Sequence, residues 1–332
     1  MADEFDRTCW RGIRIDHPAQ WELAVASRVD QPGRCTFCDR HYQRLDVRWR
    51  GLKYVPKPEL LLDKARRPAN GPEGGTTCSD LTGAPRDWSG VVRRTPEGWI
   101  VYAVRFFRAE RMLVEATLVW PGRRNTSLEK DVLSGIAPEG PPPGEAGMRH
   151  WWAMGLRVDL DARWKLQTVS AKVGRVKWRF VPTDPGSRRG RKPPPDSVAR
   201  RKADLAVERI AMPKYWLKGP LRDWLNELIG PDIQVLHQGV RDYNSHRAER
   251  LTTRSPADKL SRLRGLWNLR TDVAWRCPVE HRIYHVCYSE IARAEELSLP
   301  ESLKIYCCRP PPALVSRRAG KPRAAARGGE NE

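Results

Sequence analysis

An internal repeat constrains this chain more than any other feature of its sequence. The segment Gly12–Ser27, GIRIDHPAQWELAVAS, aligns without gaps with Gly155–Ser170, GLRVDLDARWKLQTVS, and seven of the sixteen positions are identical. The two segments lie 143 residues apart, far beyond the ~20–50-residue period of solenoid repeats. We therefore predict two tandem copies of one domain.

Composition predicts the boundaries between these copies. Residues 138–147, PEGPPPGEAG, are too rich in Pro and Gly for regular structure. Two other segments are basic and Pro-rich, which is typical of exposed loops and disordered tails. The predicted units are a first copy at 8–137, a Pro/Gly-rich linker at 138–149, a second copy at 150–308 with a basic insertion at 184–202, and a disordered basic tail at 309–332.

Alternating apolar residues predict an antiparallel hairpin late in each copy. In the first copy, a tight turn at Ala109–Glu110 pairs residues 99–107 with 111–120 and makes both faces largely apolar. In the second copy, a turn at Val279–Glu280 places Cys277 on one face, and His285 and Cys287 on the other.

Helices are predicted before and after these hairpins. Segments beginning at Pro58 and Pro220 have Pro in the first turn, which suits a helix start. A third helix follows Ser127, with Thr or Ser as its N-cap. The expected fold class is therefore α+β, with each copy an antiparallel sheet packed with helices.

The order of these elements resembles the PsbP-like superfamily, which includes the extrinsic photosystem protein, DcrB-type bacterial lipoproteins and a Ran-binding nuclear import factor. The second copy departs from the pattern, because Asp161 stands where the first has Pro18. The resemblance implies a non-enzymatic binding or scaffolding module and supplies no active-site residue. It is carried by Ile15, Pro18 and Trp21, the strand pair ending at Trp120, the helix from Ser127, and Trp164 of the second copy.

Length and composition exclude several classes of protein. An apolar content of 40% with 14 Trp is incompatible with a wholly disordered chain. No apolar run approaches the ~20 residues of a membrane span, and the acidic start MADEFDRTCW lacks the apolar region of a secretory signal. We expect a cytoplasmic protein whose eight cysteines are free thiols.

The charge balance suggests a polyanionic partner. Lys and Arg number 60 against 40 Asp and Glu, a net charge of +20, which favours contact with polyanions. The basic insertion and tail are suited to binding phosphate backbones without sequence preference, although a merely solubilising tail fits equally well. The candidate nucleic-acid-binding or polyanion-binding residues are Arg188, Arg189, Arg191, Lys192, Arg200, Arg201, Lys202, Arg317, Arg318, Lys321 and Arg323.

Cysteine and histidine spacing offers weak candidates for metal binding. Cys35, Cys38 and His41 form a CxxC knuckle with a nearby imidazole, which is half of a tetrahedral zinc site. Their segment aligns with an apolar strand of the second copy, and a strand would point the two thiols to opposite faces. Structural cysteines are therefore the favoured interpretation.

The second copy has a denser set of possible ligands. The predicted hairpin register separates Cys277 from His285 and Cys287, so these residues should not share a metal. Cys307 and Cys308 are adjacent and would point opposite ways in an extended chain. His237 and His246 flank a sequence typical of a surface turn between strands.

None of the common catalytic strings, GxSxG, HExxH, a P-loop or GxGxxG, occurs in the chain. We therefore predict a non-enzymatic protein without a cofactor, which binds another macromolecule, most simply a protein. The alternative is a nucleic-acid-associated protein that uses the basic insertion and tail. A metal-dependent or thiol enzyme is the third and weakest hypothesis. The sequence leaves the partner, the process and the oligomeric state open.

Overall fold

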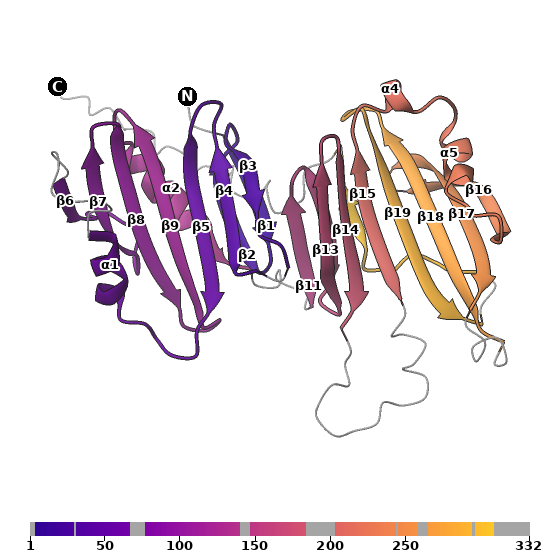
Figure 1. Cartoon of the computed structure of the whole chain (residues 1–332), viewed down its shortest axis with the longest axis horizontal. Coiled ribbons are helices and arrows are strands. Elements are labelled where there is room, and N and C mark those ends of the chain that lie inside the picture. Colours follow the sequence, from indigo (N-terminus) through magenta and orange to yellow (C-terminus); the bar gives the residue numbers. More distant parts are fainter. Residues whose placement is uncertain are drawn as a thin grey trace, which may run out of the picture.

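The chain folds into three antiparallel sheets arranged along one long axis (Figure 1). One seven-stranded sheet lies at each end, and a six-stranded sheet lies between them. Among the helices that the structure describes, none is long and apolar enough to cross a bilayer. The computed structural model describes residues 4–29, 31–66, 77–139, 147–183, 203–243, 245–257, 265–293 and 296–308.

The central sheet takes three strands from each half of the chain. Its order is β10-β2-β1-β11-β12-β20, so that the two halves meet where β1 pairs with β11, at Cys9 and Trp152. The two halves of the chain therefore share one hydrogen-bonded sheet. The strands are β1 (Phe5–Trp10), β2 (Ile13–Pro18), β10 (Ile136–Pro138), β11 (Met148–Ala153), β12 (Leu156–Asp161) and β20 (Lys304–Tyr306).

The two seven-stranded sheets have the same strand order. The first runs β3-β4-β5-β9-β8-β7-β6, and the second runs β13-β14-β15-β19-β18-β17-β16. The first contains β3 (Glu22–Ala26), β4 (Gly33–Cys38), β5 (Gln43–Gly51), β6 (Thr77–Asp80), β7 (Ser89–Thr95), β8 (Gly98–Phe107) and β9 (Met112–Pro121). The second contains β13 (Trp164–Lys172), β14 (Arg175–Pro182), β15 (Asp204–Ile210), β16 (Gln234–Tyr243), β17 (His246–Pro256), β18 (Trp267–Cys277) and β19 (Arg282–Ala292).

The predicted α+β class is wrong, because the fold is mainly β. The three sheets share one core, to which α2 contributes Leu128, Val132 and Leu133, whereas α1 and α5 each cover a small separate cluster. Leu62 of α1 packs on β7 and β8, and Leu225 of α5 packs on β17 and β18. The helices are α1 (Pro58–Arg66), α2 (Thr126–Gly135), α4 (Pro213–Trp216) and α5 (Leu221–Glu227).

The helix that starts near Ser127 has a different cap from the one expected. Asn125 is the N-cap of α2, and its side-chain oxygen accepts a hydrogen bond from the Leu128 amide at 3.0 Å. An Asn at this position satisfies an amide that has no partner within the helix. α2 then packs Leu133 into the main core beside β2.

Both predicted hairpin registers are confirmed. Phe107 pairs with Met112 across the first hairpin, and Cys277 pairs with Arg282 across the second. Strand alternation then places Cys277 in the core, while His285 and Cys287 point to the opposite face of the sheet. The period-two pattern of a strand was therefore a dependable guide in the long hairpins.

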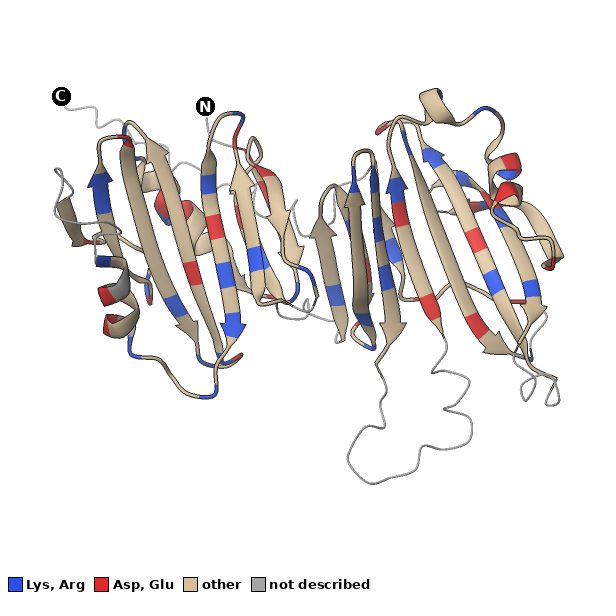
Figure 2. Ribbon diagram, in the orientation of Figure 1, with Lys and Arg blue, Asp and Glu red and all other residues tan. Residues whose placement is uncertain are grey.

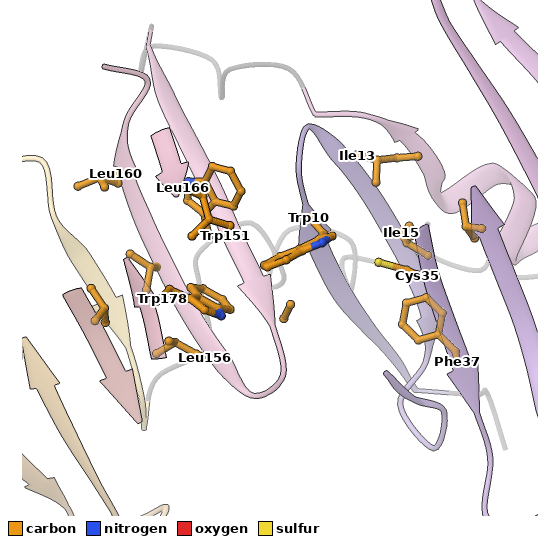
Figure 3. Packing of buried hydrophobic residues seen from close by; sticks show 14 of the residues in the cluster. Trp10, Ile13, Ile15, Cys35, Phe37, Trp151, Leu156, Leu160, Leu166 and Trp178 are labelled. Atoms are coloured by element: carbon orange, nitrogen blue, oxygen red, sulfur yellow. The ribbon is translucent and has the colours of Figure 1, made fainter. Parts of the chain in front are cut away.

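One hydrophobic core runs through both halves and is centred on Trp10 of β1 (Figure 3). The Trp10 ring is fully buried and lies 6.1 Å from Trp151 and 5.6 Å from Trp178, measured between ring centroids. Its indole nitrogen donates a hydrogen bond to the Ser27 carbonyl at 3.1 Å. Trp10 thus connects the central sheet, the first half and the second seven-stranded sheet.

Replacing Trp10 with Ala should destabilise the whole molecule. Removing a large buried aromatic side chain costs about 3–5 kcal/mol, and here the resulting cavity would lie between three sheets. Urea unfolding followed by fluorescence and circular dichroism should show one transition at lower urea for Trp10→Ala. Trp267→Ala, which removes a partly buried ring, should cost clearly less. Equal losses for both variants would contradict the central role of Trp10.

Candidate functional site

The outer face of each seven-stranded sheet, which is the face turned away from the central sheet, contains a buried carboxylate held by arginines. In the first sheet this group is Asp46 of β5, which is 5% exposed. It accepts hydrogen bonds from Thr36 at 2.6 Å, Arg34 at 2.6 Å and Arg48 at 2.8 Å. Burial alone would raise the pKa of Asp46, but these three hydrogen bonds outweigh it and lower the pKa.

The second sheet has Glu208 at the corresponding place on β15. Glu208 is 1% exposed, and it forms an ion pair with Arg175 of β14 and lies 3.6 Å from His285 Nδ1. Burial alone would raise the pKa of Glu208, but the nearby His285 imidazole and the hydrogen bonds from Arg175 lower it to about 2. Both outer faces thus place a charged carboxylate beneath exposed guanidinium groups.

His285 extends this network in the second sheet. Its Nε2 lies 2.8 Å from Asp272 Oδ1, and Asp272 in turn accepts two hydrogen bonds from Arg270 at 2.6 and 2.8 Å. Trp224 of α5 covers the imidazole, with ring centroids 5.3 Å apart. Burial alone would lower the pKa of His285, but the hydrogen bond to Asp272 and the nearby Glu208 carboxylate raise it.

A histidine beside two carboxylates has the composition of a catalytic centre, but here a substrate could not reach these side chains. His285, Asp272 and Glu208 are each at most 5% exposed, and none of them lines the cavities found around Leu81, around Ser245 or around Arg11. A general acid or base must reach the proton that it transfers. The network therefore acts on its own neighbours, by fixing the positions of the arginines.

Lys and Arg occur along the strands of both seven-stranded sheets (Figure 2). Four arginines on the outer faces are held by acids while more than two-fifths of each side chain stays exposed. The ion pairs join Arg34 and Arg48 to Asp46, Arg175 to Glu208, and Arg179 to Asp204. The exposed fractions of these side chains are 42%, 59%, 53% and 49% in the same order. Each guanidinium is oriented by its acid and keeps an open side for a ligand.

Exposed tyrosines follow the same strand in both sheets. Residues 52–57 come after β5 and 211–218 come after β15, and we call these the two tyrosine segments. Tyr54 is 83% exposed in the first segment, and Tyr215 is 75% exposed in the second. Val55 and Met212 are also more than half exposed beside them. Large exposed apolar side chains gathered at matching places are typical of a contact surface.

A cavity of ≈ 650 Å³ lies where the two halves meet, lined by Arg11, Glu139, Arg149 and Trp151 among others. Burial raises the pKa of Glu139 to about 7, although a hydrogen bond from the His150 amide opposes the shift. Arg11 is engaged by the carbonyls of residues 28, 29 and 31. The cavity is thus lined by groups that already hold the chain together.

The sequence-predicted site residues are not brought together by the described structure. Cys35 is fully buried in the core, Cys38 is half-buried on the opposite face of β4, and His41 lies in an exposed turn. The basic candidates in 184–202 and 309–332, Arg188 and Arg317 among them, lie outside the described residues. Trp151 and Trp152, with side chains that could have stacked on nucleic acid bases, are buried in β11.

One cluster was missed by sequence reasoning. His246, Cys277, Cys307 and Cys308 place one donor atom each within 4.8 Å of one another. The expectation that Cys307 and Cys308 point apart is wrong, because β20 ends at Tyr306 and the two cysteines lie in a bend. The only signal in the sequence was the unusual density of Cys and His in the second copy.

We expect His285 to make stability depend on pH. A pKa raised by folding contributes stability that is fully present below the unfolded value of ~6.5 and is lost as pH rises through the folded pKa. Removing one partner of a buried charge pair costs about 3–5 kcal/mol. His285→Gln should therefore cost most near pH 6, and the difference from wild type should shrink at higher pH.

Urea unfolding between about pH 6 and pH 9 measures this difference. The matched control is His41→Gln, which alters an exposed imidazole in a turn. If the loss of unfolding free energy in His285→Gln stays constant or grows as the pH rises, His285 is not charged in the folded protein and the prediction is wrong.

The comparisons with known proteins found structural neighbours only. No protein-family model matches the chain, and no curated protein matches it. The structure is similar to the T6SS immunity protein TplEi from Pseudomonas aeruginosa in complex with "L" peptide, at 8% identity and a TM-score of 0.35 over 87% of this chain and 88% of that one. The apo form of TplEi gives 9% identity and a TM-score of 0.36 over the same shares.

A third neighbour is the Tle4-Tli4 complex, at 9% identity and a TM-score of 0.34 over 87% of each chain. The predicted resemblance to the PsbP-like superfamily is wrong. Its α+β architecture is not the one observed, because the described strands form three antiparallel sheets. Similarity at this level assigns neither a family nor a partner to the chain.

Proposed function

We propose that this chain is a non-enzymatic binding protein that holds a partner protein with an acidic surface against its two outer faces. The observation that carries the proposal is the pairing of fixed, exposed arginines with exposed tyrosines at matching places in both sheets. Tyr and Arg are enriched among the residues that dominate protein–protein binding energy. The chain offers both on each sheet.

The arginines are prepared for a second acceptor. Arg48 and Arg179 each contact a carboxylate and still expose about half of the side chain. Ordering a flexible side chain at an interface costs about 0.5–1.5 kcal/mol. Because the acids of the sheet already restrict these arginine side chains in the free protein, less conformational entropy is lost on binding. An acidic partner then gains charge-assisted hydrogen bonds at lower entropic cost.

The tyrosine segments favour a protein partner over a nucleic acid. Val55 and Met212 stand beside Tyr54 and Tyr215 and offer apolar surface that a phosphate backbone does not use. Apolar side chains surrounded by polar groups are instead characteristic of protein interfaces. A nucleic acid bound through the basic insertion and tail is the competing outcome.

Capture of proteins by the immobilised chain tests the proposal. A partner, identified by mass spectrometry and then purified, should bind at least about 30-fold more weakly to Tyr54→Ser/Tyr215→Ser, because a residue that dominates an interface carries about 2 kcal/mol or more. Both rings are exposed, so the folded structure should not change.

Two matched charge variants distinguish the outer faces from the basic insertion. Each variant replaces four cationic residues with Gln. In both variants, Asp46 keeps its ion pair with Arg34, and Glu208 keeps its ion pair with Arg175. Loss of binding in the face variant alone supports the proposal; loss in the insertion variant alone, with nucleic acid as the bound species, contradicts it. The face variant changes Arg48, Arg50, Lys177 and Arg179, and the insertion variant changes Arg188, Arg189, Arg191 and Lys192.

A further inference from the structure

Three segments that are distant in sequence bring four metal-ligating side chains to one point. His246 begins β17, Cys277 ends β18, and Cys307 and Cys308 follow β20. His246 Nε2 lies 3.0 Å from the Cys307 Sγ and 3.4 Å from the Cys308 Sγ, and these two sulfurs are 4.0 Å apart. We propose that His246, Cys277, Cys307 and Cys308 form a structural zinc site.

The separations match those of tetrahedral coordination. Zn–S bonds of about 2.3 Å and Zn–N bonds of about 2.0–2.1 Å place neighbouring sulfurs roughly 3.8 Å apart, and sulfur and nitrogen roughly 3.5 Å apart. The observed separations of 4.0, 3.4 and 3.0 Å lie near these values. The fourth donor, the Cys277 sulfur, lies within 4.8 Å of the other three, so all four ligands already stand around one point.

The donor set selects the kind of metal and the kind of site. Three thiolates and an imidazole are the Cys₃His set of structural zinc sites, whereas magnesium and calcium prefer oxygen. Four protein ligands leave no open position for water or substrate, so the ion would not be catalytic.

Two kinds of neighbour at the cluster are suited to metal-bound thiolates. The Glu280 amide points at the Cys277 sulfur from 3.5 Å, which is the outer hydrogen bond that orients a metal-bound thiolate. Arg247 and Arg276 line a cavity together with His246. Their charges offset the net negative charge that three thiolates and one Zn²⁺ produce.

The position of the site indicates what it does. β20 is only three residues long, yet it forms an edge of the central sheet by pairing with β12. At the opposite edge, the equally short β10 follows directly from α2, which is anchored by the buried Val132 and Leu133. A metal bound at Cys307 and Cys308 would anchor β20 to the β17–β18 hairpin in place of a helix.

Metal analysis of the reduced full-length protein tests the site. Purified wild type should carry one zinc ion per chain, and Cys308→Ser should lose it. Cys38→Ser, which alters another half-buried cysteine, should keep its zinc. Removal of zinc by a chelator should lower the melting temperature of wild type and of Cys38→Ser, and should leave Cys308→Ser unchanged.

Cobalt titration gives a second readout that does not depend on stability. Co²⁺ added to the zinc-free protein should produce the intense thiolate charge-transfer absorption and the visible bands of a tetrahedral site. Both should disappear in His246→Ala and in Cys308→Ser. Wild type without zinc and without cobalt absorption would overturn the proposal, as would a disulfide among these cysteines found by mass spectrometry under reducing conditions.

Discussion

The packing of Trp10 against Trp151 and Trp178 is the contact on which the rest of the structure depends. A buried Trp removes about 150–250 Å² from water, worth ~4–6 kcal/mol at ~25 cal/mol per Å². Trp10 belongs to the central sheet, and both of its partners belong to the second half. The contact therefore fixes the position of one half against the other, and with it the relative position of the two outer faces.

The inner faces of the sheets form the shared apolar core, whereas the outer faces carry charged residues beside the small apolar clusters under α1 and α5. Asp46 and Glu208 are nearly inaccessible although they lie on outer faces, because arginines and neighbouring side chains cover them. A buried carboxylate without partners would be costly. These two have several hydrogen-bond donors each, and the arrangement that satisfies them also orients the guanidinium groups. Stability of the sheet and readiness for a partner thus come from the same ion pairs.

Strand periodicity predicted the local structure better than the fold class. The registers of both long hairpins and the burial of Cys35 follow from side chains that alternate along a strand. The α+β prediction was wrong because it assumed that the helices after Pro58 and Pro220 cover whole sheet faces. The strands β1 and β11 instead build a third sheet, which no local sequence pattern indicates. Cys307 and His246 meet only through that long-range pairing, so no spacing in the sequence could reveal them.

The two halves use the same positions for different chemistry. Arg7 pairs with Asp16 across β1 and β2, and His150 pairs with Asp159 across β11 and β12. The side chains of the first pair are joined at 2.6 Å and those of the second at 2.7 Å. Each buried aspartate therefore keeps a cation-forming partner across its hairpin, while the partner changes from a permanent cation to a titratable one. The edges of the central sheet differ in the same way, with α2 beside β10 and the Cys and His cluster beside β20. Each position needs an anchor for a buried charge or a short edge strand, and different side chains supply it in the two halves.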